Sequence, residues 1–197
     1  MGVPATVLHE TDDEQERRWV AAAQGGDPDA FRRIVETYRD RLYTFLLRLV
    51  RHHEEAEDLA QEAFVRAWRH LSGYDSRWPF RAWLFTIARN LALNALRRPW
   101  ATIISIEAGA EDGRNALALA AATASPAEQA VTGEQKRRLG QALGQLSVQA
   151  AMIFTLFYQE GMAISEIAQT VGMTAGAVKV ALHRARQTLR RRLCDSP

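Results

Sequence analysis

Aromatic rings and arginines crowd the stretch between positions 74 and 98. The rings are Tyr74, Trp78, Phe80, Trp83 and Phe85, and the arginines are Arg77, Arg81, Arg89, Arg97 and Arg98. Such rings stack on unpaired bases while cations follow the backbone, so the composition is typical of a site for single-stranded DNA. A small helical domain also needs an aromatic core. We expect Trp83 and Phe85 to supply it, and the rings nearest the preceding loop, at positions 74 and 78, to be exposed.

The last third of the chain is strongly basic. Residues 134–197 carry nine Lys and Arg against four Asp and Glu, although the whole chain has a net charge of only +2. Six cations and no acid lie between positions 179 and 192: Lys179, Arg184, Arg186, Arg190, Arg191 and Arg192. This one-sided segment favours a polyanionic partner, most simply nucleic acid. A solvated helix end, with cations at the negative end of its dipole, explains the charge equally well.

The basic segment begins inside a predicted helix-turn-helix over residues 164–183. Ala168 is small where two helices must cross closely, and Gly172 follows it where the turn needs a glycine. Thr174 is placed to cap the second helix, which carries the cations. A helix of this kind can enter the major groove of DNA.

The remaining pattern predicts an all-α chain of two small helical domains joined by a flexible linker. Apolar residues recur at helical spacing after the Asp27-Pro28 pair, which is typical of a helix start, and further helices are expected over 54–71 and 79–96. We expect a disordered lead over 1–18 and a first domain over 19–100. An alanine-rich linker over 101–133 and a second domain over 134–197 would complete the chain.

Several classes of function are excluded by what the sequence lacks. The single cysteine, Cys194, permits neither an internal disulfide nor a multi-cysteine zinc site. No apolar run approaches the roughly 18–20 residues of a membrane span, and no signal peptide opens the chain, so we expect a cytoplasmic protein. A glycine-rich phosphate loop and a His-Glu-x-x-His motif are absent, because His52-His53-Glu54-Glu55 lacks the second histidine. We expect no catalytic residue, no metal and no cofactor.

Three blocks of sequence follow one another in a family-specific order. They are Asp-Leu-Ala-Gln-Glu-Ala-Phe at 58–64, Phe-Arg-Ala-Trp-Leu-Phe-Thr-Ile-Ala-Arg-Asn at 80–90, and Val-Lys at 178–179 with Leu-His-Arg-Ala-Arg at 182–186. In order and spacing the chain resembles the extracytoplasmic-function (group IV) sigma factors of bacterial RNA polymerase over about residues 20–193. The resemblance implies two domains, sigma regions 2 and 4, without region 3 or region 1.1.

The resemblance also implies partners for the two domains. In this family the first block docks on the clamp helices of the polymerase β′ subunit, which would place Asp58, Gln61 and Glu62 at that interface. Three polar groups on one helical face can meet basic residues of a partner coil. Region 4 would meet the β flap, and an anti-sigma protein is an expected inhibitor.

Region 2 of the family opens the minus-ten element by capturing a flipped base. That role maps onto the loop with Tyr74, Arg77 and Trp78 and onto Asn90, whose amide can pair with a base edge. Further contacts along the helix would come from Asn94, Arg97 and Arg98. Opening of this kind is a binding equilibrium for the unpaired strand, without a chemical step.

Region 4 would place the helix from Thr174 in the major groove of the minus-thirty-five element. The sequence departs from the family pattern here, since members usually have serine at Ala163, arginine at Phe157, threonine at Ala177 and serine-arginine at Val180-Ala181. The remaining polar candidates are Lys179, His183, Arg184 and Arg186. Phosphate binding therefore survives better than base reading.

The leading hypothesis is an alternative sigma factor that binds core RNA polymerase and promoter DNA and assists promoter opening. A stand-alone regulator is an alternative, because the stretch from Glu166 to Val180 also resembles LuxR-type DNA-binding helices. That alternative leaves residues 58–62 and the aromatic segment unexplained. A sigma mimic that sequesters an anti-sigma protein is a second alternative, which the altered region 4 positions favour.

Overall fold

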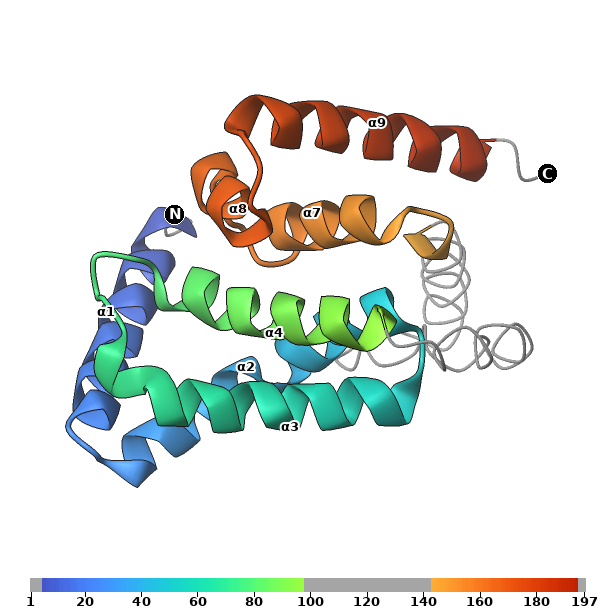
Figure 1. Ribbon diagram of the computed structural model, residues 1–197. Helices are drawn as coiled ribbons and strands as arrows, with labels where there is room; N and C mark the ends of the chain where they lie inside the picture. The colour runs from blue at the N-terminus through green and yellow to red at the C-terminus, as the bar shows by residue number, and fades with distance from the viewer. Residues whose placement is uncertain (1–4, 98–142, 195–197) are drawn as a thin grey trace, which may run out of the picture.

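The computed structural model describes residues 5–97 and 143–194. Every regular element in these two ranges is helical, so the predicted all-α class is confirmed (Figure 1). The predicted linker over 101–133, the start of the second domain before residue 143 and the site candidate Arg98 lie outside the described residues.

The structure differs from the predicted disordered lead at the N-terminus. Helix α1 spans Ala5–Gln24, and its last turns pack on α2 (Pro28–Val50) through the buried side chains of Val20 and Ala23. The Tyr38 hydroxyl of α2 also donates a hydrogen bond to Glu16. The buried residues that the structure describes in α1 lie in its final turns, and the middle of the helix is polar, which is why the sequence pattern did not reveal the helix.

The start of α2 follows the sequence prediction. The carboxylate of Asp27 accepts hydrogen bonds from the backbone N–H groups of Asp29 (2.8 Å) and Ala30 (3.2 Å), and Pro28 occupies the first helical position. The predicted amphipathic face is buried, with Leu42 and Phe45 inaccessible to solvent. These contacts fix the helix on which the other helices of the first group pack.

Helix α3 (His53–His70), a short 3-10 turn η1 (Leu71–Gly73) and α4 (Phe80–Leu96) complete the first group. Alanines at positions 56, 60, 63 and 67 form the inner face of α3 and allow close packing on α2 and α4. Phe85 of α4 is fully buried and meets the Phe45 ring edge to face, with the ring centres 5.0 Å apart. The aromatic core predicted for this helix is confirmed at Phe85.

The second group consists of α7 (Val148–Tyr158), α8 (Ile164–Val171) and α9 (Ala175–Cys194). Gly172 ends α8 in the left-handed conformation, with φ of 69°, which a residue with a side chain adopts only under strain. The Thr174 hydroxyl accepts a hydrogen bond from the Ala177 N–H at 3.2 Å and so caps α9. The predicted helix-turn-helix is confirmed.

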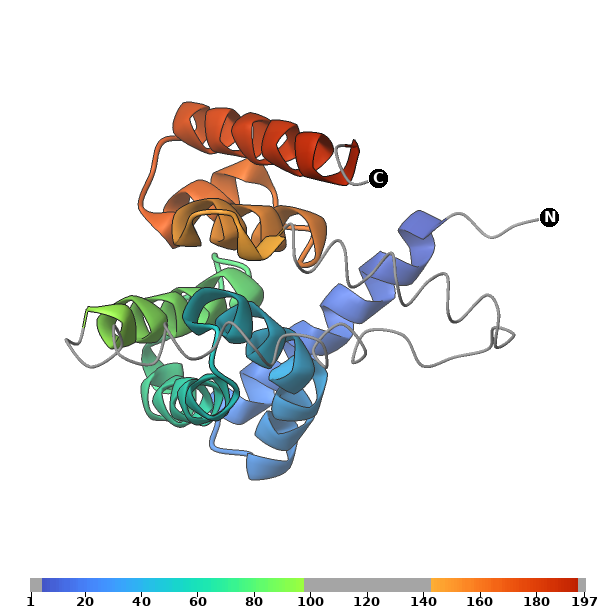
Figure 2. The same ribbon diagram turned by 90° about the vertical axis from the view of Figure 1, so that its right-hand side faces the viewer.

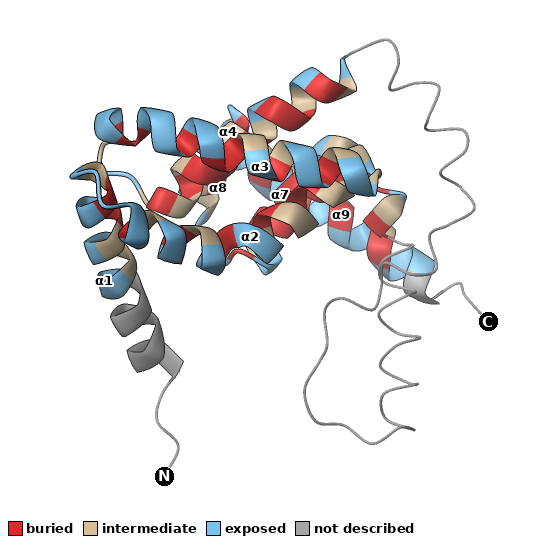
Figure 3. Cartoon of the chain, turned by 90° about the horizontal axis from the view of Figure 1, so that it is seen from below, coloured by how far each residue is buried: buried red, intermediate tan, exposed pale blue. Residues whose placement is uncertain are grey.

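The two groups of helices pack directly against each other. Helix α4 lies against α8, and α2 lies against α7, so that the second group sits over the first (Figures 1 and 2). One apolar core runs from Val20 in α1 to Leu182 in α9, and buried residues occupy the faces where helices meet (Figure 3). Within the described ranges, no helix is long and apolar enough to cross a bilayer.

Candidate polymerase and DNA interfaces

The outer face of α3 presents the three residues predicted to bind polymerase. Asp58 and Gln61 are exposed, and Glu62 is half-buried in an ion pair with Arg66, one turn further on, at 2.7 Å. A cation of a partner would therefore meet a carboxylate that is already neutralised in part by Arg66. The acidic start and basic end of α3 both fit the helix dipole, which stabilises this helix without help from a partner.

Sequence reasoning missed Val65 on the same face. Its side chain is 43% exposed one turn beyond Gln61, so the face combines polar groups with an apolar centre. Trp68 is a further exposed apolar residue of α3, and its ring packs on Phe31 of α2 with the ring centres 4.9 Å apart. The four-residue spacing from Gln61 to Val65 is the sequence signal that could have found it.

The loop between η1 and α4 corrects one expectation about exposure. The ring of Tyr74 is buried between Phe80 and Trp83, with centres 5.6 and 5.1 Å away, and not exposed. Its hydroxyl donates a hydrogen bond to the backbone carbonyl of Trp78. Burial raises the pKa of Tyr74 to about 12, so the hydroxyl keeps its proton at neutral pH. The ring was expected outside because it lies in a polar loop, whereas it folds back to complete the core.

The buried tyrosine directs the rest of the loop outward. Trp78 is 45% exposed, and Arg77 is exposed beside it. The Arg77 guanidinium donates hydrogen bonds to the Asp75 carboxylate, with Nη2 2.6 Å from one carboxylate oxygen. These hydrogen bonds hold the pKa of Asp75 below its ordinary value. The loop therefore offers one stacking ring, Trp78, where sequence reasoning expected two.

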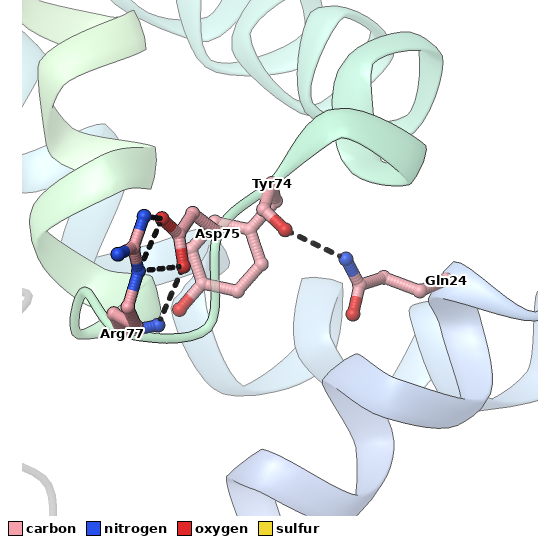
Figure 4. Close-up of polar contacts among 4 residues, drawn as sticks. All are labelled: Gln24, Tyr74, Asp75 and Arg77. Carbon is pink, nitrogen blue, oxygen red and sulfur yellow. Dashed lines mark hydrogen bonds and ion pairs between the residues drawn. The ribbon is translucent and has the colours of Figure 1, made fainter.

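The end of helix α1 holds the start of this loop through hydrogen bonds. The side-chain amide of Gln24 donates to the carbonyl oxygens of Leu71 at 3.1 Å and of Tyr74 at 2.9 Å. Figure 4 shows the bond to Tyr74. Both bonds join the end of α1 to a segment about 50 positions away, one that continues into the outward-facing part of the loop. Gln24 is thus a second residue that sequence reasoning missed, and no local pattern could have found it.

Helix α4 carries the remaining minus-ten candidates on one exposed stripe. Asn90, Asn94 and Arg97 follow one another at helical spacing and are all exposed. The side-chain oxygen of Asn90 already accepts a hydrogen bond of 3.0 Å from Arg89. A bidentate pairing with a base would use the amide donor and the second lone pair of this oxygen, which Arg89 leaves available.

Four of the minus-thirty-five candidates at the start of α9 and along it are exposed. They are Thr174, Lys179, His183 and Arg184, and they define the outward face of α9. Arg186 is exposed but lies over the Phe157 and Tyr158 rings of α7, 6.0 and 5.7 Å from their centres. A cation held over aromatic rings stabilises the packing of α9 on α7, so this residue already has a structural role.

The departures from the sigma pattern have visible consequences in α8 and α9. Ala163 precedes α8 without a side-chain acceptor, and the helix start relies on the carboxylate of Glu166, which accepts from the Ala163 N–H at 2.9 Å. Val180 stands 51% exposed on the face of α9 that also carries Lys179 and His183. The outward face of α9 is therefore basic with an apolar residue inside it.

Comparisons with known proteins agree with this geometry. The family model of sigma-70 region 2 matches residues 34–102, and that of sigma-70 region 4 matches residues 136–189. The ECF RNA polymerase sigma factor SigW of Bacillus subtilis is 30% identical over 91% of this chain and 97% of its own length. This chain belongs to the extracytoplasmic-function sigma factors of RNA polymerase.

Solved structures share the fold. The structure of CnrH in complex with the cytosolic domain of CnrY matches with a TM-score of 0.64 and 25% identity, over 92% of this chain and 99% of that one. The sigma factor RpoE of Bartonella quintana, solved with the anti-sigma factor NepR, matches with a TM-score of 0.63 and 24% identity, over 85% and 98%. The leading hypothesis of an alternative sigma factor is confirmed, and the LuxR-type alternative has no support from these matches.

Proposed function

We propose that this sigma factor binds core RNA polymerase through the outer face of α3 and reads promoters through two separate surfaces. Trp78 and Arg77 in the loop, with Asn90, Asn94 and Arg97 on α4, would hold the unpaired minus-ten strand. The outward face of α9 would bind the minus-thirty-five duplex. Its place of action would be the cytoplasm, and the role requires no catalytic residue in this chain.

One observation supports this proposal most strongly. The three surfaces belong to different helices, yet each leaves its candidate side chains exposed while the opposite side of the same helix is buried in the common core. Apart from Tyr74 and Glu62, the candidates on the described elements contribute no buried side chain to the fold. Apart from the Thr174 cap and the contact of Arg186 with α7, stability therefore does not explain why polar and cationic groups gather on these faces.

The test is transcription in vitro from fragmented genomic DNA of the source organism. Core polymerase with and without this protein is supplied with the fragments, and the transcript starts are sequenced. Starts that depend on the protein and share two spaced upstream elements are expected. If the protein gives no new starts while it binds core polymerase, the proposal fails.

A paired set of variants assigns the polymerase surface. The double variant Gln61→Ala, Glu62→Ala is expected to weaken polymerase binding and all protein-dependent starts together. Glu36→Ala serves as the control, because it removes an exposed carboxylate from α2 without touching α3. Equal loss in both variants would show that net charge, and not the α3 face, controls binding.

A sigma mimic that captures an anti-sigma protein is the second candidate function. The observation that favours it is the outward face of α9, where Ala177 and Val180 replace polar residues usual in the family. The solved complexes named above each hold a second protein, which fits a protein partner for this chain. Absence of protein-dependent starts, together with tight binding to such a partner, would favour the mimic.

A further inference from the structure

The interface between the two groups of helices has an unusual division of donors and acceptors. Within the described ranges, arginines of the first group donate the hydrogen bonds that cross this interface, and the acceptors all lie in the second group. The contacts run from Arg41 to Glu160 (2.9 Å from Nε and 2.6 Å from Nη2), Arg48 to the Thr155 hydroxyl (3.0 Å), Arg51 to the Leu146 carbonyl (3.2 Å), Arg81 to Glu166 (3.2 Å) and Arg89 to the Val171 carbonyl (3.0 Å). We call Arg41, Arg48, Arg51, Arg81 and Arg89 the arginine row.

The second group compensates this row only in part. Five cations face two carboxylates, and the other three acceptors are neutral oxygens. The Nε atoms of Arg81 and Arg89 are buried without a hydrogen-bond partner. Burial also lowers the pKa of Arg48 from its ordinary value. A docked surface that leaves buried guanidinium donors unsatisfied is an incomplete partner for them.

A sugar-phosphate backbone supplies what the docked helices lack. Each phosphate carries a full negative charge and two oxygens that accept both prongs of a guanidinium. The row also adjoins the proposed minus-ten stripe, because Arg89 precedes Asn90 on α4 and donates to its side-chain oxygen. A strand bound along α4 would therefore reach the row once α8 leaves it.

We propose that the arginine row is a second nucleic-acid surface, which binds the phosphate backbone after the group α7–α9 has separated from it. DNA and the second group of helices then compete for the same five arginines. The inference rests on the proposed promoter binding in one respect, since elements about 25 base pairs apart are separated by roughly 85 Å. Helices α4 and α8 pack against each other, and the axes of packed helices lie only about 10 Å apart. One duplex therefore cannot engage both groups while they stay docked.

Energy transfer between dyes on the two groups tests the competition in the free full-length chain. Cys194 is replaced by serine, and dyes are attached through cysteines placed at the exposed positions 36 on α2 and 169 on α8. A 20-nucleotide oligo-dT is the probe. Energy transfer is expected to fall as the oligonucleotide binds. In the Glu160→Gln, Glu166→Gln variant, the same fall in transfer is expected at a lower oligonucleotide concentration. Undiminished transfer at saturation, or failure of the probe to bind at low salt, overturns the inference.

The salt dependence of oligonucleotide binding tests the row itself. The double variant Arg48→Gln, Arg51→Asn is expected to lower the slope of log K against log salt by about 1.4, which corresponds to two lost phosphate contacts. Asparagine is chosen at position 51 because that residue has a φ of 60°. The control Arg32→Gln, Arg33→Gln removes two exposed arginines of α2 from outside the row and should leave the slope nearly unchanged.

Failure of this inference is distinguishable from failure of the proposed function. If the row variant keeps the wild-type slope while protein-dependent transcription starts persist, the row does not bind DNA and the sigma function stands. If the starts are absent from the wild type but the slope changes as expected, the surface binds nucleic acid and the promoter role is wrong.

Discussion

Removal of the Gln24 side chain is expected to loosen the loop proposed to bind the minus-ten strand without disturbing α9. Gln24→Ala deletes two hydrogen bonds, to the carbonyls of Leu71 and Tyr74, and leaves both oxygens partly shielded from water. At about 1 kcal/mol for each neutral bond, the ordered loop loses about 2 kcal/mol. An equilibrium between ordered and disordered loop then shifts by roughly thirtyfold, which is the upper limit for the loss of affinity.

The measurement uses holoenzyme on a promoter identified from the sequenced transcript starts. Binding of the single-stranded minus-ten oligonucleotide is followed by fluorescence anisotropy, and binding of the minus-thirty-five duplex serves as the internal reference. The first is expected to weaken and the second to stay unchanged. Gln15→Ala is the matched control, since it removes an exposed glutamine from the same helix. Unchanged binding of the single strand by Gln24→Ala would refute the reasoning that α1 holds the loop.

Three further expectations concern the second group of helices and its contacts. Arg41→Ala should lower the free energy of unfolding in urea by about 2 kcal/mol, because it leaves the Glu160 carboxylate, only 3% exposed, without its cation. Glu160→Gln should cost less, because the partly exposed Arg41 side chain can then turn to water. Ala163→Ser should raise the free energy of unfolding by about 1 kcal/mol by giving α8 a side-chain cap, and no gain would show that Glu166 already suffices. Lys179→Ala should weaken binding to all duplexes alike and lower the salt slope by about 1. Val180→Asn removes an exposed apolar group that could meet a thymine methyl group, so it should change base preference at one position. Selection from a random duplex library separates these two outcomes. Identical sequence preferences in the two variants would contradict the expectation for Val180→Asn.

The parts of the fold that depend on local chemistry were predictable from the sequence. The Asp27 cap, the turn at Gly172 and the Thr174 cap each need particular residue types within a few positions, and the structure has all three. The predicted bounds of α3 and α4 also lie within two residues of the observed ones, and α2 begins where the sequence predicted. Such signals are short-range, so a linear pattern carries them in full.

Features that depend on distant segments were not predictable. Helix α1 shows almost no apolar period, and its place in the fold comes from a few buried residues and from Gln24 bonds to a segment about 50 positions away. Burial of Tyr74 likewise depends on how Phe80 and Trp83 close over it. The roles of the candidate site residues stay predictions, because their exposure is compatible with binding but does not by itself identify a partner.

The carboxylate of Glu166 links the start of the helix-turn-helix to its neighbour. A single oxygen accepts from the Ala163 N–H within its own group and from Arg81 across the interface. The first of these bonds needs nothing from α4, so the first turn of α8 keeps its own cap when the two groups part. The second bond would be lost at that moment, and the same negative charge would then face any approaching DNA. On the proposed separation, Glu166 would thus cap α8 and also repel phosphate from the α8 side, which favours approach to the outward face of α9.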